Sequence, residues 1–205
     1  RDEPMTVATI TADMVRELRE RTGAGMMDCK RALTEADGDL EVATTILRER
    51  GMAAAGKKSG REVREGLVSS YIHTGGRVGV LIEVNCETDF VARTEQFQDL
   101  VRVLAVQVAG LSPRWVDVES IPAADLEARK AELAQDPGVA SKPADIQAKI
   151  VDGQLQKWFR EVVLLEQPFR DTDRLVRDVV NEAIATIGEN IRVRRFTRYA
   201  LGEEL

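Results

Sequence analysis

The spacing of apolar residues changes along this chain from a helical period to a strand period and back again. Between residues 77 and 84 every second position is apolar: Val78, Val80, Ile82 and Val84. This alternation is typical of a strand with one buried face. A β-rich run at residues 67–72 precedes it, and His73-Thr74-Gly75-Gly76 between the two runs is a hairpin signal. Because helical stripes flank this pair, we predict an α+β protein with a small antiparallel sheet packed by helices.

The N-terminal part, residues 11–51, is predicted to form three short helices. Thr11 is a suitable cap for the first helix, which ends at the glycine-containing turn 22–25. The second helix begins near Met26 and carries one apolar stripe, and the third ends at Gly51. A three-helix unit of this size has little core, so it should be only modestly stable alone.

Three further segments complete the expected division of the chain. Residues 1–10 are expected to be disordered. Residues 52–65 hold many charges and two glycines, and we interpret them as a linker with some helical content. Residues 66–205 are expected to form the α+β core.

Apolar stripes predict more helices in this core. The helix after the hairpin carries its stripe at Phe97, Leu100, Val101, Leu104 and Val108. A polar helical region follows over residues 121–157, and it is expected to be broken at Pro137, Pro143 and Gly153. Two amphipathic helices come next, the second closed by Gly188, and a final strand is predicted over residues 191–201. Its apolar phase slips at Arg194-Arg195, which indicates a bulge.

Composition limits the classes of function. The net charge of −6 argues against a general nucleic-acid binder, whose surface would carry a basic excess. Two cysteines, Cys29 and Cys86, are too few for a secreted disulfide scaffold and favour a reducing compartment. No apolar run approaches a membrane span. Residues 1–4 lack the blocks of a signal peptide, and Met5 is expected to be the natural start. We therefore expect a cytoplasmic protein without direct nucleic-acid or membrane contacts.

Signals for catalysis are weak. Residues 51–58, Gly-Met-Ala-Ala-Ala-Gly-Lys-Lys, nearly fit a phosphate-binding loop. Lys58 replaces the hydroxyl residue that would hold magnesium, and a helix precedes the motif where a strand is needed, so we interpret the match as accidental. His73 is the only histidine and lies in a turn without a nucleophile beside it. The cysteines lack zinc-binding spacing. No enzymatic activity, cofactor or metal site is predicted.

Two other groups of residues are candidates for binding. Arginines cluster on the last strand at Arg192, Arg194, Arg195 and Arg198. They could meet phosphates, but in an acidic chain we favour a solvated sheet face or an interface that pairs with acidic groups on another protein. The segment 85–91, Asn-Cys-Glu-Thr-Asp-Phe-Val, turns from a strand into a helix near the surface. Taken alone, Thr88 or Asp89 could cap that helix and Phe90 could fold beneath it.

Three stretches, in order along nearly the whole chain, resemble the elongation factor Ts family. Residues 16–33 resemble its N-terminal three-helix module, which is similar to ubiquitin-associated domains. Residues 83–92, Glu-Val-Asn-Cys-Glu-Thr-Asp-Phe-Val-Ala, resemble its central signature. Residues 161–169, with the closing helix and strand, resemble its C-terminal part.

This resemblance implies a guanine-nucleotide exchange factor that binds the GTPase elongation factor Tu with GDP bound and promotes GDP release by displacing magnesium. The family's tip that contacts the GTPase falls here on Thr88, Asp89, Phe90 and Val91. The contacts of the N-terminal module fall on Arg19, Met26 and Met27. These three residues would contact the same GTPase domain.

The resemblance also implies a compact form with one core subdomain and no protruding coiled coil, because residues 112–160 are short. Such forms are expected to be homodimers, which would make residues 66–205 the dimerisation domain as well. The edge of the strand 191–201 is a candidate for pairing. Two alternatives remain open at this point: a ubiquitin-associated-like interaction module fused to an unrelated α+β domain, and a phosphate-loop hydrolase.

Overall fold

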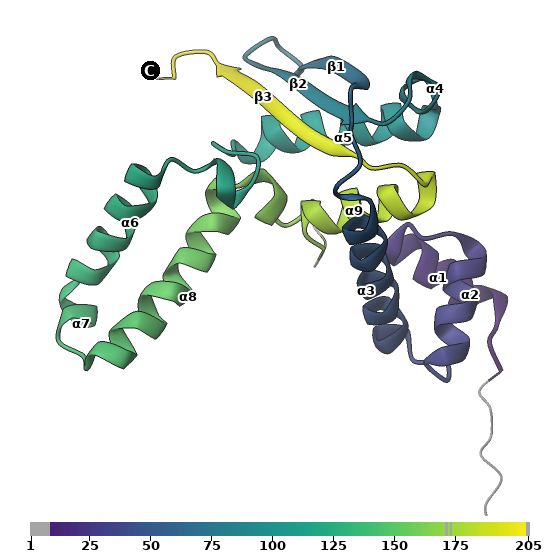
Figure 1. The fold of residues 1–205 in the computed structure, drawn as a ribbon, viewed down its shortest axis with the longest axis horizontal. Coiled ribbons are helices and arrows are strands. Elements are labelled where there is room, and N and C mark those ends of the chain that lie inside the picture. The colour runs from purple at the N-terminus through teal and green to yellow at the C-terminus, as the bar shows by residue number, and fades with distance from the viewer. Residues whose placement is uncertain (1–8, 171, 173, 204–205) are drawn as a thin grey trace, which may run out of the picture.

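The computed structural model describes residues 9–170, 172 and 174–203. These residues contain nine α-helices and one three-stranded antiparallel sheet, which confirms the predicted α+β class. Residues 1–8, on which most of the predicted N-terminal disorder falls, lie outside this range. Figure 1 shows an N-terminal helical module, a sheet backed by helices, and a helical hairpin that projects away from both. No helix of the described part is long and apolar enough to cross a membrane.

The N-terminal module consists of α1 (Ala12–Thr22), α2 (Met26–Glu35) and α3 (Leu40–Lys58). Thr11 caps α1 as predicted, because its hydroxyl accepts a hydrogen bond from the amide of Met14 at 3.3 Å. The three helices enclose a small apolar cluster of their own: Leu18, Ala24, Cys29, Ala32, Leu33, Ala36 and Ala43. The likeness of this unit to ubiquitin-associated domains stays a prediction.

The third helix is longer than its sequence suggested. It does not end at Gly51 but continues through the alanine-rich segment to Lys58, so the irregular connection to the sheet is confined to residues 59–64. Gly51 is buried and lies against the backbone of Asn181, in helix α9 (Val176–Ile187). Helix α3 therefore packs against α9, and this contact connects the module to the rest of the protein.

The sheet has the order β1-β2-β3, with β1 at Glu65–Ile72, β2 at Val78–Cys86 and β3 at Arg192–Ala200. The predicted bulge in β3 is confirmed, because Glu83 lies opposite Arg195 while the next residue, Val84, lies opposite Val193. The extra residue, Arg194, shifts the register.

One face of the sheet is covered by α5 (Glu95–Leu111), which in turn packs on α9 (Figure 1). The predicted alternation of β2 and the predicted stripe of α5 both point into this core. Its most buried members include Val80, Ile82, Val84, Phe97, Val101, Leu104, Val108, Val176, Val180 and Ile184. Fully burying a side chain of this size contributes about 1.5–3 kcal/mol, so these contacts dominate the stability of the core.

The projecting hairpin was not anticipated. It is formed by α6 (Ala123–Gln135), the short α7 (Pro137–Ala140) and α8 (Ala144–Val162), with α6 packed on α8. The expectation that this region is too short to protrude is therefore wrong (Figure 1). Gly153 does not break the helix as expected but lies inside α8. A separate apolar cluster that includes Trp115, Trp158 and Phe159 holds the hairpin together.

Of the glycines that the structure describes, Gly66 is the one where an added Cβ would meet the closest contact. Its φ is +139°, and a Cβ at this position would lie 2.1 Å from the carbonyl oxygen of Val84. Gly66→Ala should lower the free energy of unfolding by about 1–3 kcal/mol or more, measured by urea denaturation. Gly153→Ala is the control, since a Cβ there meets nothing within 4 Å and alanine is the better helix former by about 1 kcal/mol. Equal stability of both variants would contradict this account.

Candidate functional site

The chain forms an exposed corner where it leaves β2. We use "the corner" for residues 87–92, which include the one-turn helix α4 (Asp89–Ala92). Thr88 caps α4, because its hydroxyl accepts a hydrogen bond from the amide of Val91 at 3.3 Å. Val91 and Ala92 are buried in the core, so they fix the base of the corner. Of the four predicted tip residues, Val91 therefore faces inward.

Phe90 points out of the corner. Its side chain is 76% exposed, which makes the alternative that Phe90 folds beneath the helix wrong. Asp89, also exposed, pairs with Arg93 one helical turn later at 2.8 Å. An aromatic ring that the fold itself leaves in water gains nothing from folding, and it is available for burial against another molecule.

A carboxylate from a distant part of the chain holds the corner in place. One oxygen of Glu189 accepts hydrogen bonds from the amides of Glu87 and Thr88, at 3.0 and 3.1 Å. Its other oxygen accepts a hydrogen bond from the Thr88 hydroxyl at 2.7 Å. In the opposite direction, the amide of Asn190 donates to the carboxylate of Glu87 at 2.6 Å. The end of α9 and the corner are therefore linked by side chains from both sides.

The thiol of Cys86 lies at the base of the corner and donates a hydrogen bond to the carbonyl of Thr88 at 3.2 Å. Burial raises the pKa of Cys86 to about 11, and the negative charge of Glu189 adds to this shift. The thiol therefore remains protonated and serves as a donor. Glu189 and Asn190 were not predicted to support the tip, because nothing in the local sequence connects residues so far apart. Cys86 was not predicted to support it either, although it lies only two residues before Thr88.

The second predicted contact lies on the N-terminal module. Met26 and Met27, at the start of α2, are 61% and 67% exposed, and Arg19 is exposed on α1. In Figure 1 the module and α4 both lie on the side of the molecule opposite the projecting hairpin. Two adjacent exposed methionines at a helix start form an adaptable apolar surface, since the side chain is flexible and polarisable.

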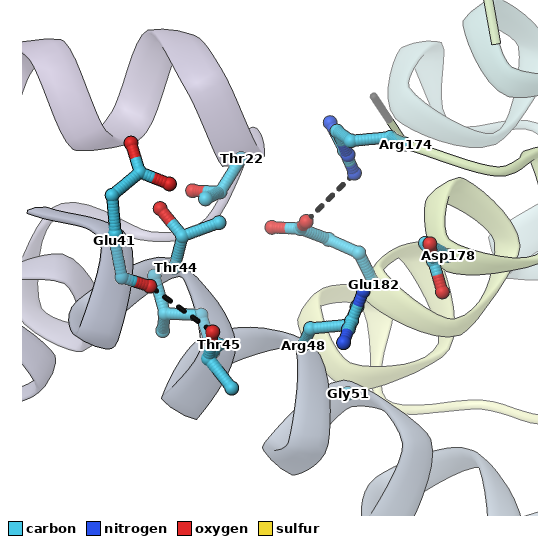
Figure 2. Close-up of a pocket in the computed structure, with 10 residues that line it drawn as sticks. Thr22, Glu41, Thr44, Thr45, Arg48, Gly51, Arg174, Asp178 and Glu182 are labelled. Carbon is cyan, nitrogen blue, oxygen red and sulfur yellow. Dashed lines mark hydrogen bonds and ion pairs between the residues drawn. The ribbon is translucent and has the colours of Figure 1, made fainter. Parts of the chain in front are cut away.

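A cavity of about 210 Å³ lies at the junction of the module with α9. Figure 2 shows Thr22, Glu41 and Thr44 on one side of it and Arg174, Asp178 and Glu182 on the other. Arg174 pairs with Glu182 at 3.0 Å, while the second oxygen of Glu182 is buried and has no hydrogen-bond partner among the described residues. Burial raises the pKa of Glu182 to about 7; the Arg174 guanidinium opposes this shift and the Asp28 carboxylate adds to it.

The other candidates for chemistry lie in ordinary structural settings. The near-match to a phosphate loop, residues 51–58, is helical throughout and belongs to α3, not to a linker or a strand-to-helix loop. The His73 ring is hydrogen-bonded to the Tyr71 hydroxyl at 2.9 Å, and Cys29 is in the module core. Within the described residues, no three His, Cys, Asp or Glu side chains are grouped to hold a metal ion.

Three of the four arginines of β3 pair with acidic side chains of this chain itself, an arrangement that was not predicted, while Arg194 and Arg195 lie on a solvated face as we favoured. Arg195 contacts Glu83 at 2.7 Å, and Arg194 contacts the same carboxylate at 3.6 Å. Arg198 pairs with Glu203 at 2.9 Å. Because Arg194 and Arg195 share one carboxylate, these ion pairs compensate only part of the positive charge of the strand.

The described structure thus combines an α+β core, a separate helical module and exposed apolar surfaces that include Phe90 and Met26-Met27. This arrangement is typical of proteins that act by binding another macromolecule. The profile of the family Elongation factor TS matches residues 54–203. The chain belongs to the elongation factor Ts family, and hence to the translation elongation factors.

The similarity to individual relatives extends over nearly the full length of each chain. Elongation factor Ts of Carboxydothermus hydrogenoformans is 54% identical over 197 residues, covering 96% of this chain and 91% of the relative. Elongation factor Ts of Synechococcus elongatus is 57% identical over 200 residues, covering 96% and 90%. That of Caldanaerobacter subterraneus subsp. tengcongensis is 53% identical over 195 residues, covering 95% and 98%.

Glu182 should make the stability of the protein depend on pH. Its pKa rises from an ordinary value of 4.5 to about 7 on folding, so the folded state keeps a proton that the unfolded state has lost. Its contribution to the free energy of unfolding is therefore complete below pH 4.5 and is lost as the pH rises through 7. Allowing for partial exposure, we expect a loss of about 1–2 kcal/mol.

Urea denaturation at pH 5 and pH 8 measures this effect, with Glu182→Gln as the comparison. Relative to the native chain, the Glu182→Gln variant should have a higher free energy of unfolding at pH 8 than at pH 5. If the two proteins changed in parallel between these pH values, Glu182 would not be the group responsible.

Proposed function

We propose that this protein binds elongation factor Tu in its GDP-bound form and accelerates the release of GDP. The observation that carries this proposal is the exposed Phe90 on a corner anchored by Val91 and tied to Glu189. Membership of the elongation factor Ts family supports the choice of partner. The chain itself supplies contacts and no covalent chemistry.

In the proposed mechanism, Phe90 inserts between structural elements of the GTPase domain, and their movement would disturb the magnesium ion that the GTPase holds at GDP. Magnesium neutralises phosphate charge, so displacing it removes much of what holds the nucleotide. Burying one phenylalanine yields about 1.5–3 kcal/mol. Reversing an equilibrium from 1:99 to 99:1 needs about 5.5 kcal/mol. Phe90 alone is insufficient, and other contacts must contribute.

We propose that contacts of the N-terminal module supply the remaining free energy needed to shift the GTPase. Arg19, Met26 and Met27 would contact the same GTPase domain, while Thr88 and Asp89 would contact it beside Phe90. Because binding is reciprocal, GDP must weaken the binding of this protein as much as this protein weakens the binding of GDP. The packing of α3 on α9 keeps the two contact surfaces on one framework.

The alternatives are less well supported. The alternative of an interaction module fused to an unrelated α+β domain does not fit, because the match to the elongation factor Ts family covers residues 54–203. A phosphate-loop hydrolase would need residues 51–58 to form a loop after a strand, whereas they are helical.

We also propose that the protein forms a homodimer, in agreement with the expectation for compact members of the family. The face of the sheet that α5 leaves uncovered carries exposed apolar side chains on all three strands or just beyond them: Val68, Ile72, Leu81, Tyr199 and Leu201. The paired register places Ser70, Leu81 and Thr197 side by side on this face, which we call the outer sheet face. A contiguous apolar patch on a sheet is a typical association surface. We favour this face over the free edge of β3, because packing faces together would bury these side chains.

Phe90→Ala should slow the GDP release that this protein causes, by about tenfold or more, because the wedge is removed while an exposed side chain contributes little to folding. The measurement is the release of fluorescent GDP from purified elongation factor Tu, with thermal unfolding as the check on the fold. Leu111→Ala, another exposed apolar truncation, is the matched control and should leave the rate unchanged. Native activity of the Phe90 variant would rule out the wedge.

Leu81→Lys should convert the dimer to a monomer, because it places a charge at the centre of the outer sheet face. The molar mass is measured by light scattering after size exclusion. A dimeric variant would point to pairing at the edge of β3 instead. A monomeric native chain at micromolar concentration would refute the homodimer itself.

A further inference from the structure

We propose that Glu189 is a positioning residue for nucleotide exchange: its carboxylate holds the corner in the orientation that presents Phe90 to the partner. This inference rests on the function proposed above, and it concerns a residue outside the tip. The carboxylate reaches across from the end of α9 and accepts three hydrogen bonds from Glu87 and Thr88, at 2.7–3.1 Å.

The geometry connects Glu189 to the tip through Thr88. The single hydroxyl proton of Thr88 is donated to Glu189 at 2.7 Å, while a lone pair of the same oxygen accepts from the amide of Val91 at 3.3 Å. Phe90 lies in the sequence between Thr88 and Val91, inside the turn that the second of these hydrogen bonds closes. The direction of the Thr88 hydroxyl, and with it the cap of α4, is therefore set by Glu189.

A reciprocal contact strengthens the connection. Glu87 accepts a hydrogen bond from the amide of Asn190 at 2.6 Å, so each of the two segments supplies a carboxylate to the backbone of the other. Gly188, with a φ of +88°, ends α9 and turns the chain so that Glu189 and Asn190 leave the helix toward the corner. The side-chain amide of Asn190 also donates to the carbonyl of Arg61 at 2.9 Å. This hydrogen bond links Asn190 to the connection, residues 59–64, that precedes β1.

The corner needs this external support because α4 is only one turn long. An isolated helix of this length is not stable, since the cost of ordering its first turn exceeds the return from so few hydrogen bonds. Burial of Val91 and Ala92 fixes the base of the turn. The amides of Glu87 and Thr88 have Glu189 as their hydrogen-bond acceptor, and without it they would have to turn toward water.

The consequence for exchange is that Glu189 should affect the rate of GDP release more than the binding of the partner. A ring held in its productive orientation uses its contacts to bias the GTPase, whereas a mobile ring loses part of that free energy on being ordered. The apolar surface that binds the partner is still present without Glu189, but it is presented less often in the right direction.

The first experiment examines the corner without any partner. Hydrogen exchange of the amides of Glu87 and Thr88 is compared by NMR in the native chain, Glu189→Ala and Glu189→Gln. We expect at least about tenfold faster exchange in the alanine variant, since both amides lose their acceptor. The glutamine variant should be intermediate, because its carbonyl oxygen still accepts but the negative charge is gone. Native protection in both variants would overturn the proposal.

The second experiment measures GDP release from elongation factor Tu over a range of concentrations of each variant. For Glu189→Ala we expect the maximal rate to fall about tenfold, with less than about a threefold change in the half-saturating concentration. Glu189→Gln should restore part of the rate. The matched control is Glu166→Ala, which removes a carboxylate paired with Arg177 at 2.8 Å near the opposite end of α9 and should exchange at the native rate.

These outcomes separate the two proposals. A native maximal rate for Glu189→Ala, or an equal loss in Glu166→Ala, would overturn the role of Glu189 while leaving exchange by the native chain intact. A native chain that does not accelerate release would overturn the proposed function itself. If Glu189→Ala lowers the melting temperature, the glutamine variant still tests the inference, because partial protection and partial rate must then appear together.

Discussion

The packing of α3 against α9 is the contact on which the arrangement of this protein depends. The N-terminal module has its own cluster of small apolar side chains, and the sheet has a larger one, so the two would be independent units without a shared element. The C-terminal extension of α3 supplies this connection, with Gly51 buried against the backbone of Asn181. On its other side α9 packs on α5, and through it on the sheet. A single helix therefore orients the module relative to the core.

The same helix reaches the exposed corner at its C-terminal end. Glu182, in the body of α9, lies at the junction with the module, and Glu189, just beyond its end, holds the backbone of Glu87 and Thr88. Helix α9 consequently fixes the positions of two exposed apolar surfaces, Met26-Met27 and Phe90, relative to each other. Two contacts fixed at folding cost less free energy to engage together than two contacts on a mobile linker, because their relative orientation is already ordered.

Much of the fold was predictable because its signals are local. The alternation that starts at Val78 and the hairpin turn at residues 73–76 gave the sheet, and the phase slip near Arg194 gave its bulge. The predictions failed where tertiary contacts or competing local signals determine where a helix ends. Met52-Ala-Ala-Ala continues α3 because alanine is the best helix former, although the neighbouring charges and glycines suggested a linker. Gly153 costs α8 only about 1 kcal/mol, too little to interrupt a helix that is packed against α6.

The candidate site shows the same division between local and distant information. The cap at Thr88 was one of two local options, but the direction of Phe90 depends on which neighbours are buried, and no pattern around it encodes Glu189. The magnitudes explain why that distant residue matters. Burial of Phe90 on a partner yields about 1.5–3 kcal/mol, while ordering a mobile side chain on binding costs about 0.5–1.5 kcal/mol. Taking the middle of each range, a loose corner would therefore lose roughly half of what its one aromatic ring contributes. If Glu189 positions the corner as proposed, its hydrogen bonds order the backbone of Glu87 and Thr88 during folding, so that this part of the ordering cost does not reduce the free energy available to bias the partner.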